Sequence, residues 1–266
     1  MDELQKKLAQ VRATLQELGS VVVAFSGGVD SSLLLRLAHQ ELDGRCLAIT
    51  AYSHSFPEQE REEAHLFCES FGIRHCIIEN DEFSIKGFSE NPPDRCYLCK
   101  HALFTKMEAV AAEYGIPWII EGSNLDDDKD YRPGIKAVRE HGVKSPLLEA
   151  GLTKAEIRSL STQLGLATAD KLSFTCLSTR LPYGEEITID KLERIKRAEQ
   201  FLRDLGFRQL RVRSHLDLAR IEVDEHEMPA FSDPGLRKHI HDTLITFGFK
   251  FVSVDLLGYK SGSLNI

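Results

Sequence analysis

A candidate phosphate site lies in residues 21–32, whose sequence is Val-Val-Val-Ala-Phe-Ser-Gly-Gly-Val-Asp-Ser-Ser. An apolar run followed by two glycines and a leucine-rich segment predicts a buried strand, a turn and the start of a helix. The first N–H groups of a helix lack intrahelical partners, and the helix dipole favours anions there. The glycines permit positive φ, and Asp30 can hold a Mg²⁺ ion between phosphate oxygens. The predicted phosphate and magnesium contacts are Ser26, Gly27, Gly28, Asp30, Ser31 and Ser32.

Residues 26–31, Ser-Gly-Gly-Val-Asp-Ser, resemble the PP-loop of the ATP pyrophosphatases. The two commoner nucleotide patterns, G-x-x-x-x-G-K-S/T and a G-x-G-x-x-G after a strand, do not occur in this sequence. The resemblance implies that the protein binds ATP and transfers AMP to an oxygen atom of its substrate.

Three of the six cysteines are candidates for chemistry. Cys96 and Cys99 form a C-x-x-C pair at the expected start of a helix, and Cys176 lies in a later loop. Zinc sites, redox dithiols and iron–sulfur clusters all use such pairs, and the surroundings here do not resemble a thioredoxin-like unit. Three thiolates leave one coordination position open, which suits a 4Fe–4S cluster with one free iron. Zinc and unligated thiols remain the alternatives.

Two arginines, Arg211 and Arg213, are two positions apart on an expected strand and therefore point to the same face. Together with Arg180 they can form a cationic pocket, because guanidinium groups bind phosphates and carboxylates well. The alternative interpretation is an exposed basic strand face.

Composition narrows the classes of function. The chain has 266 residues, 42% of them hydrophobic and 28% charged, which is typical of a globular protein with a large and a small domain. A net charge of −8 argues against a general nucleic-acid binder. The apolar runs are too short to span a bilayer, and the charged N-terminus does not resemble a signal peptide. We expect a cytoplasmic protein without a membrane anchor.

Strands and helices alternate in the first part of the chain. Strands are expected at 21–25, 46–52, 74–78 and 118–121, and helices at 3–18, 57–71 and 94–114, with a further helix from Thr153. This alternation predicts an α/β fold with a doubly wound parallel sheet, assigned to residues 1–170. Residues 171–266 are expected to form a smaller α+β domain, with helices at 189–205 and 235–247 and strands at 209–213, 219–223 and 250–256.

Ligands of such sheets bind beyond the carboxyl ends of the strands. Ala51 follows the second strand and is expected to contact adenosine. Gly122 and Ser123 follow the fourth strand, where their backbone can approach ATP. The acidic residues from Asp126 to Asp130 are expected to share the magnesium ion or to hold their own loop.

Motifs beyond the PP-loop resemble one family, LarE. The resemblance covers nearly the whole chain and rests on Asp130-Tyr-Arg-Pro-Gly134, Cys176 with Arg180-x-Pro-Tyr-Gly184, Arg211-Val-Arg213 and Ala219-Arg-Ile-Glu222. It implies an ATP-dependent sulfur transferase that acts in the synthesis of the nickel-pincer nucleotide, which is the cofactor of lactate racemase. ATP adenylylates a carboxylate of a pyridinium dicarboxylate mononucleotide, and sulfur then displaces AMP. Arg132 is thereby placed among the ATP contacts, and Glu199 beside the catalytic pocket of Cys176, Arg180, Arg211 and Arg213.

The source of sulfur is open at this point. In sacrificial members of the family the residue matching Cys176 gives up its own sulfur, whereas the extra Cys96 and Cys99 indicate a three-cysteine variant. That variant is expected to deliver hydrosulfide, from a source outside the protein, through a 4Fe–4S cluster. Amide-forming and tRNA-thiolating PP-loop enzymes are the alternatives. The resemblance also implies a homo-oligomer.

Overall fold

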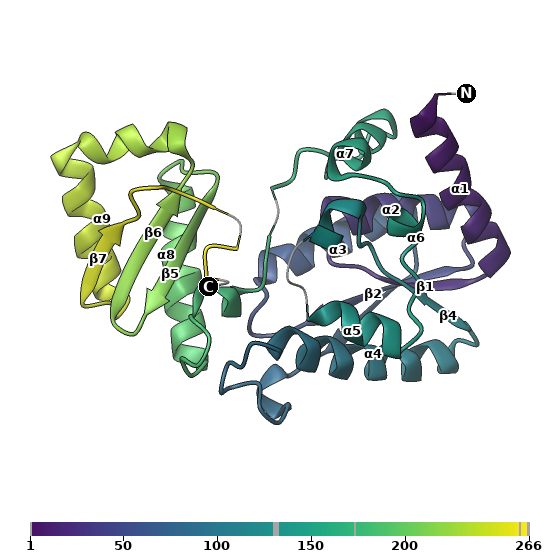
Figure 1. Cartoon of the computed structure of the whole chain (residues 1–266), viewed down its shortest axis with the longest axis horizontal. Helices are drawn as coiled ribbons and strands as arrows, with labels where there is room; N and C mark the ends of the chain where they lie inside the picture. The colour runs from purple at the N-terminus through teal and green to yellow at the C-terminus, as the bar shows by residue number, and fades with distance from the viewer. Residues whose placement is uncertain (1, 130–132, 173, 261, 265–266) are drawn as a thin grey trace. The chain divides into compact units, whose positions relative to one another are not determined.

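The structure is a computed structural model that describes residues 2–129, 133–172, 174–260 and 262–264. The chain divides into two compact units (Figure 1). Unit 1 comprises Met1–Ile85 and Asp94–Phe174, and unit 2 comprises Lys86–Pro93 and Thr175–Ile266. A short segment of the first half of the sequence thus belongs to the C-terminal unit.

Unit 1 is built on a parallel sheet with strand order β3-β2-β1-β4. Its strands are β1 (Val21–Ala24), β2 (Cys46–Tyr52), β3 (His75–Glu79) and β4 (Trp118–Ile120). Its helices are α1 (Glu3–Leu18), α2 (Val29–Glu41), α3 (Glu58–Phe71), α4 (Arg95–Glu113), α5 (Gly134–Glu140), α6 (Pro146–Glu149) and α7 (Lys154–Gln163). Short 3-10 turns lie at η1 (Glu82–Ser84) and η2 (Leu125–Lys129). The predicted doubly wound α/β fold is confirmed.

Alternation of side chains along β1 explains why both faces of this sheet are covered. Val21 and Val23 belong to a buried cluster with α1, α2, α3, α6 and α7, whereas Val22 packs in a second cluster with α4 and α5. Figure 1 shows these two groups of helices on opposite sides of the strands. Strands buried on both faces read as continuous apolar runs, as Val21–Ala24 does.

Unit 2 contains a three-stranded sheet with order β5-β6-β7. Its elements are η3 (Leu177–Arg180), α8 (Ile189–Asp204), β5 (Leu210–His215), β6 (Leu218–Val223), η4 (Glu225–Ser232), α9 (Pro234–Thr246) and β7 (Phe251–Val254). Antiparallel pairing is typical of an α+β domain, and β5 pairs antiparallel with β6. β7 instead runs parallel to β6, because α9 carries the chain back across the sheet before β7 begins.

Among the residues described, none of the helices combines the length and the apolar character needed to cross a bilayer.

Candidate active site

The turn after β1 has the geometry that a phosphate loop requires. Gly27 has φ +72°, and a Cβ atom there would lie 3.3 Å from the Cβ of Ala64 in α3, so both the conformation and the space favour glycine. Gly28 instead has an extended backbone and is the N-cap of α2. Of the two glycines, Gly27 has the expected positive φ and Gly28 does not. The Ser31 hydroxyl donates to the Gly28 carbonyl at 3.2 Å and accepts from the Ser26 N–H at 3.3 Å.

Asp30 lies in the first turn of α2 and already has a cationic partner. Its Oδ2 atom is 2.5 Å from Nζ of Lys154, and its Oδ1 atom accepts a hydrogen bond from Nδ2 of Asn124 at 3.4 Å. A carboxylate that faces a cation at a helix N-terminus suits Mg²⁺ and phosphate chemistry, because Mg²⁺ is usually bound through one or two carboxylates together with substrate phosphates. The residues present therefore fit a magnesium–ATP complex.

The loop after β4 approaches α2 closely. A Cβ atom at Gly122 would lie 3.0 Å from the backbone nitrogen of Ser31, so only glycine fits beside the phosphate turn. Glu121, which is buried, accepts from the N–H and the hydroxyl of Ser123 at 3.1 and 2.9 Å and from the Ser145 hydroxyl at 2.6 Å. Ser123 is thus held by Glu121 at the predicted ATP edge of the sheet.

The acidic loop has a structural role in its described part. Asp127 accepts the backbone N–H of Asn124 at 3.1 Å, and Asp126 accepts that of Lys154 at 2.8 Å. These bonds position the two residues that contact Asp30. Arg132, predicted as an ATP contact, lies outside the described residues, as does Asp130.

A chain of hydrogen bonds supports the residue that precedes the phosphate turn. The Thr50 hydroxyl on β2 donates to the carbonyl of Phe25 at 2.8 Å, and Nε2 of His75 on β3 lies 2.8 Å from the same hydroxyl oxygen. Because the hydroxyl proton is directed to Phe25, Nε2 of His75 must donate to Thr50. Burial, with a smaller contribution from the charge of His65, lowers the pKa of His75 to about 4. Ala51, the predicted adenosine contact, is the next residue of β2.

The C-x-x-C pair lies in the first two turns of α4. Cys96 and Cys99 are three residues apart and therefore share one face of the helix, and both are half-buried. Sγ of Cys99 accepts from Nδ2 of Asn80 at 3.6 Å, and Nη2 of Arg95 lies 4.0 Å from Sγ of Cys96. Within the described part of each unit, no group of three histidine, cysteine, aspartate or glutamate side chains is placed to hold a metal ion. Cys176 belongs to unit 2, so the meeting of the three thiols stays a prediction.

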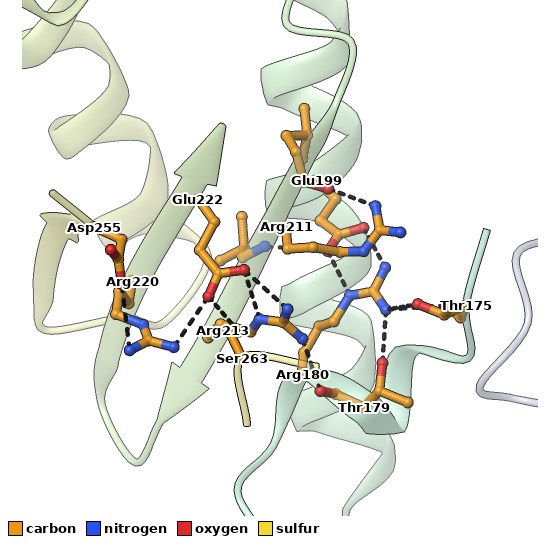
Figure 2. Close-up of polar contacts among 12 residues, drawn as sticks. Thr175, Thr179, Arg180, Glu199, Arg211, Arg213, Arg220, Glu222, Asp255 and Ser263 are labelled. Atoms are coloured by element: carbon orange, nitrogen blue, oxygen red, sulfur yellow. Dashed lines mark hydrogen bonds and ion pairs between the residues drawn. The ribbon is translucent and has the colours of Figure 1, made fainter. Parts of the chain in front are cut away.

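In unit 2, Arg180 organises the turn at residues 175–179, which contains Cys176; Figure 2 shows its contacts to Thr175 and Thr179. Its side chain is fully buried, and it pairs with Glu199 of α8 through Nε at 2.7 Å and Nη2 at 3.1 Å. Nη1 donates to the carbonyl of Cys176 at 3.2 Å and to both oxygens of Thr175 at 2.7 and 3.0 Å. Arg180 thus holds the backbone of the turn at residues 175–179, and its own side chain is not exposed.

Arg213 and Arg211 lie on β5, beside this pair (Figure 2). Arg213 pairs with Glu222 of β6 at 2.9 Å and donates to the carbonyl of Thr179 at 3.0 Å. The guanidinium of Arg211 stacks over the ring of Tyr259 at 5.1 Å. Glu222 also pairs with Arg220, which in turn reaches Asp255. Both β5 arginines are about one-twentieth exposed, so an exposed basic strand face does not describe them.

Burial and mutual charge perturb this cluster. Burial, with the nearby charge of Arg180, lowers the pKa of Arg211 to about 10, although Glu199 and Tyr259 oppose the shift. Burial alone would raise the pKa of Glu199, but the charge and hydrogen bonds of Arg180, together with Arg211 and Arg203, hold it below its ordinary value. Five arginines meet three carboxylates in this network, so positive charge is in excess.

Sequence reasoning missed Lys154, Asn124 and Glu121. A lysine directly after the Thr153 N-cap opposes the dipole of α7, and that unfavourable position was a usable signal of a carboxylate partner. Nothing in the spacing of Asn124 or Glu121 distinguished them from ordinary loop residues.

A four-stranded parallel sheet, a glycine turn at the start of α2 and a carboxylate in the first turn of that helix define a PP-loop nucleotide-binding protein. The Asparagine synthase family model, which describes such a domain, matches residues 4–88. The chain is 42% identical over 262 residues to an uncharacterised protein of Synechocystis, and the match covers 98% of each.

The chain is also 36% identical over 267 residues to the pyridinium-3,5-bisthiocarboxylic acid mononucleotide synthase of Lactiplantibacillus plantarum, covering 100% of this chain and 96% of that enzyme. A more distant match, 24% identical over 214 residues, is to one of the subunits of the glutamine-hydrolysing GMP synthase of Archaeoglobus fulgidus, with 76% of this chain and 69% of that protein covered. The chain belongs to the LarE family of PP-loop proteins, and it is an ATP-dependent, adenylylating sulfurtransferase.

Proposed function

We propose that this enzyme adenylylates a carboxylate of a pyridinium dicarboxylate mononucleotide and converts it into a thiocarboxylate. The observation that carries the proposal is the full-length similarity to the Lactiplantibacillus plantarum synthase, whose name states that product chemistry. The anion-binding turn of unit 1 and the arginine cluster of unit 2 support it independently.

In the first step a carboxylate oxygen attacks the α-phosphorus of ATP, and the bond to the bridging oxygen breaks to release pyrophosphate. Asp30 would hold the Mg²⁺ that neutralises the leaving pyrophosphate, and Lys154, now 2.5 Å from Asp30, would supply a second positive charge. The N–H groups at the start of α2 bind the phosphate oxygens. In the second step a sulfur nucleophile attacks the acyl carbon, and AMP leaves with the bonding electrons.

The arginine cluster would bind the anionic substrate. The excess of positive charge around Arg211 and Arg213 suits a phosphate and carboxylates, which guanidinium groups bind through paired hydrogen bonds. Glu199 and Arg180 would keep Cys176 in place through the turn at 175–179.

The sulfur route that we propose uses all three thiols, Cys96, Cys99 and Cys176. The helix-start position of the C-x-x-C pair and the N–H donors beside both sulfurs fit anionic sulfur ligands. When bound, a 4Fe–4S cluster on three thiolates supplies one open iron position for an external sulfide. We further propose that the enzyme works in the cytoplasm, as a homo-oligomer.

The test is an anaerobic reaction with the protein, ATP, Mg²⁺, the pyridinium dicarboxylate mononucleotide and sulfide. We expect stoichiometric pyrophosphate, AMP and thiocarboxylate, detected by mass. Asp30→Asn is expected to abolish pyrophosphate release, whereas Asp242→Asn, on the exposed face of α9, is expected to leave it unchanged. Product formed with ammonia in place of sulfide would instead favour an amide-forming ligase.

A second outcome concerns the sulfur atom. If thiocarboxylate forms without added sulfide, once per chain, and the mass of Cys176 falls by the loss of hydrogen sulfide, the cysteine itself is the donor. The cluster part of the proposal would then be wrong, and the adenylylation part would stand.

A further inference from the structure

Asn80 is a buried polar residue that the ATP chemistry does not use. It follows the last residue of β3, and its backbone N–H donates to the carbonyl of Tyr52 at the end of β2 at 2.8 Å. The side chain is 2% exposed. Main-chain bonding therefore fixes Asn80 at the carboxyl edge of the sheet, the edge at which ligands of such sheets bind.

The Asn80 side chain links this edge to the C-x-x-C pair. Its Nδ2 donates to Sγ of Cys99 at 3.6 Å, across to α4. Its Oδ1 atom is buried and has no hydrogen-bond partner among the described residues. Leaving a buried amide oxygen unsatisfied is destabilising, so this arrangement is not the one that stability alone would select.

Arg95 makes the corresponding contact to the other cysteine. Its side chain is buried, and Nη2 lies 4.0 Å from Sγ of Cys96. Both sulfurs of the pair therefore face an N–H donor, and Cys96 also lies in the first turn of α4, at the positive end of its dipole. Donors of this kind stabilise a negatively charged sulfur, and hydrogen bonds to sulfur are among the factors that set the potential of iron–sulfur clusters.

We propose that Asn80 is a positioning residue for the cluster site, which orients Sγ of Cys99 and stabilises it as an anionic metal ligand. This inference rests on the proposed function only in taking Cys99 as a ligand. Residues that hydrogen-bond to a metal ligand typically change metal affinity about 10- to 100-fold when they are replaced.

The test is an anaerobic titration of the full-length apoprotein with Co²⁺ alone, followed by the thiolate-to-cobalt absorption band. Two variants, Asn80→Leu and Asn80→Ala, both remove the donor to sulfur but differ in size, so a shared effect isolates the hydrogen bond. We expect both to weaken Co²⁺ binding about 10- to 100-fold and to lower the reduction potential of the reconstituted cluster. ATP affinity should not change, because the backbone bond to Tyr52 is kept.

Three outcomes separate the claims. Weaker binding in both variants, with wild-type unfolding temperature, supports the role of Asn80. Wild-type Co²⁺ affinity and cluster potential in either folded variant would overturn it and leave the proposed function intact. Absence of both the cobalt band and iron in the wild-type protein would overturn the cluster route together with this inference.

Discussion

At the scale of single residues, the least expected feature is the burial of charge in unit 2. Arg180 and Glu199 are both fully buried, and their side chains satisfy each other while Arg180 also binds the turn around Cys176. A buried ion pair adds little net stability, but removing one partner leaves an uncompensated charge. We therefore interpret the pair as holding the backbone turn that contains Cys176.

Glu199→Gln tests that interpretation. We expect a loss of about 3–5 kcal/mol in the free energy of unfolding at neutral pH, because the guanidinium of Arg180 would stay buried without its counter-charge. Urea unfolding measures the loss. The matched control is Glu193→Gln on the same helix, whose side chain is half exposed and pairs with the exposed Lys196, so its effect should stay within about 0.5 kcal/mol. Equal losses in the free energy of unfolding for the two substitutions would contradict the assignment of Glu199 as the buried counter-charge of Arg180.

His75 predicts a dependence of stability on pH. Its pKa falls from 6.5 to about 4 on folding, so between these values the unfolded chain binds a proton that the folded chain does not. Stability contributed by the neutral ring is therefore lost as the pH falls from 6.5 toward 4, with a slope of up to about 1.4 kcal/mol per pH unit.

Replacing His75 by glutamine removes the titrating group and keeps a donor to Thr50. Urea unfolding of the two proteins across this pH range should show a shallower slope for His75→Gln. Parallel curves would show that His75 titrates alike in the folded and unfolded states.

At the scale of elements, the close approach of the β4 loop to α2 shapes the nucleotide site. Gly122→Ala would press a methyl group against the Ser31 backbone at 3.0 Å and tilt the N–H groups at the start of the helix. Overpacking of this kind costs about 1–3 kcal/mol, so we expect ATP affinity to fall roughly 10- to 100-fold. Calorimetric titration with ATP measures this affinity. An unchanged dissociation constant would show that the loop moves to accommodate the methyl group and would contradict the prediction.

Periodicity predicted most elements because their patterns are local. The strand at 46–52 and the helix at 3–18 have the predicted bounds, and the helix expected at 94–114 is found as Arg95–Glu113. The capping box of Thr153 and Glu156 is present at the start of α7. Helix α5 was not predicted, because its seven residues are too few to show a period.

The candidate site was only partly predictable, because a sequence pattern is local and many contacts of the site are not. Ser26, Gly27 and Asp30 are adjacent in sequence and form one motif. The contact between Lys154 and Asp30 joins residues 124 positions apart, and the burial of Arg180 depends on α8 covering it. A sequence pattern carries the type of a side chain but not the partner that folding brings to it.

At the scale of the whole molecule, the residues that we propose for the nucleotide chemistry differ from those that we propose for the sulfur chemistry. Asp30 and the phosphate turn belong to unit 1, as do Cys96 and Cys99, while Cys176 and the arginine cluster belong to unit 2. We therefore expect adenylylation and sulfur transfer to be separable by substitution.

This separation is testable with cysteine variants. Cys99→Ala and Cys176→Ala should still release pyrophosphate from ATP when the mononucleotide is present, at rates within about a factor of ten of wild type, because no thiol takes part in attack on phosphorus. Neither should yield thiocarboxylate. Cys68→Ala, in the apolar core of unit 1, is the control that should retain both activities. Loss of pyrophosphate release in the Cys99 and Cys176 variants alone would contradict the separation.

The most direct test of the central claim combines iron analysis of the anaerobically purified protein with the intact mass of the chain after several turnovers. We predict about four irons per chain, bound through Cys96, Cys99 and Cys176, and an unchanged chain mass. Iron-free protein whose mass falls by one hydrogen sulfide, with a single thiocarboxylate formed per chain, would contradict it.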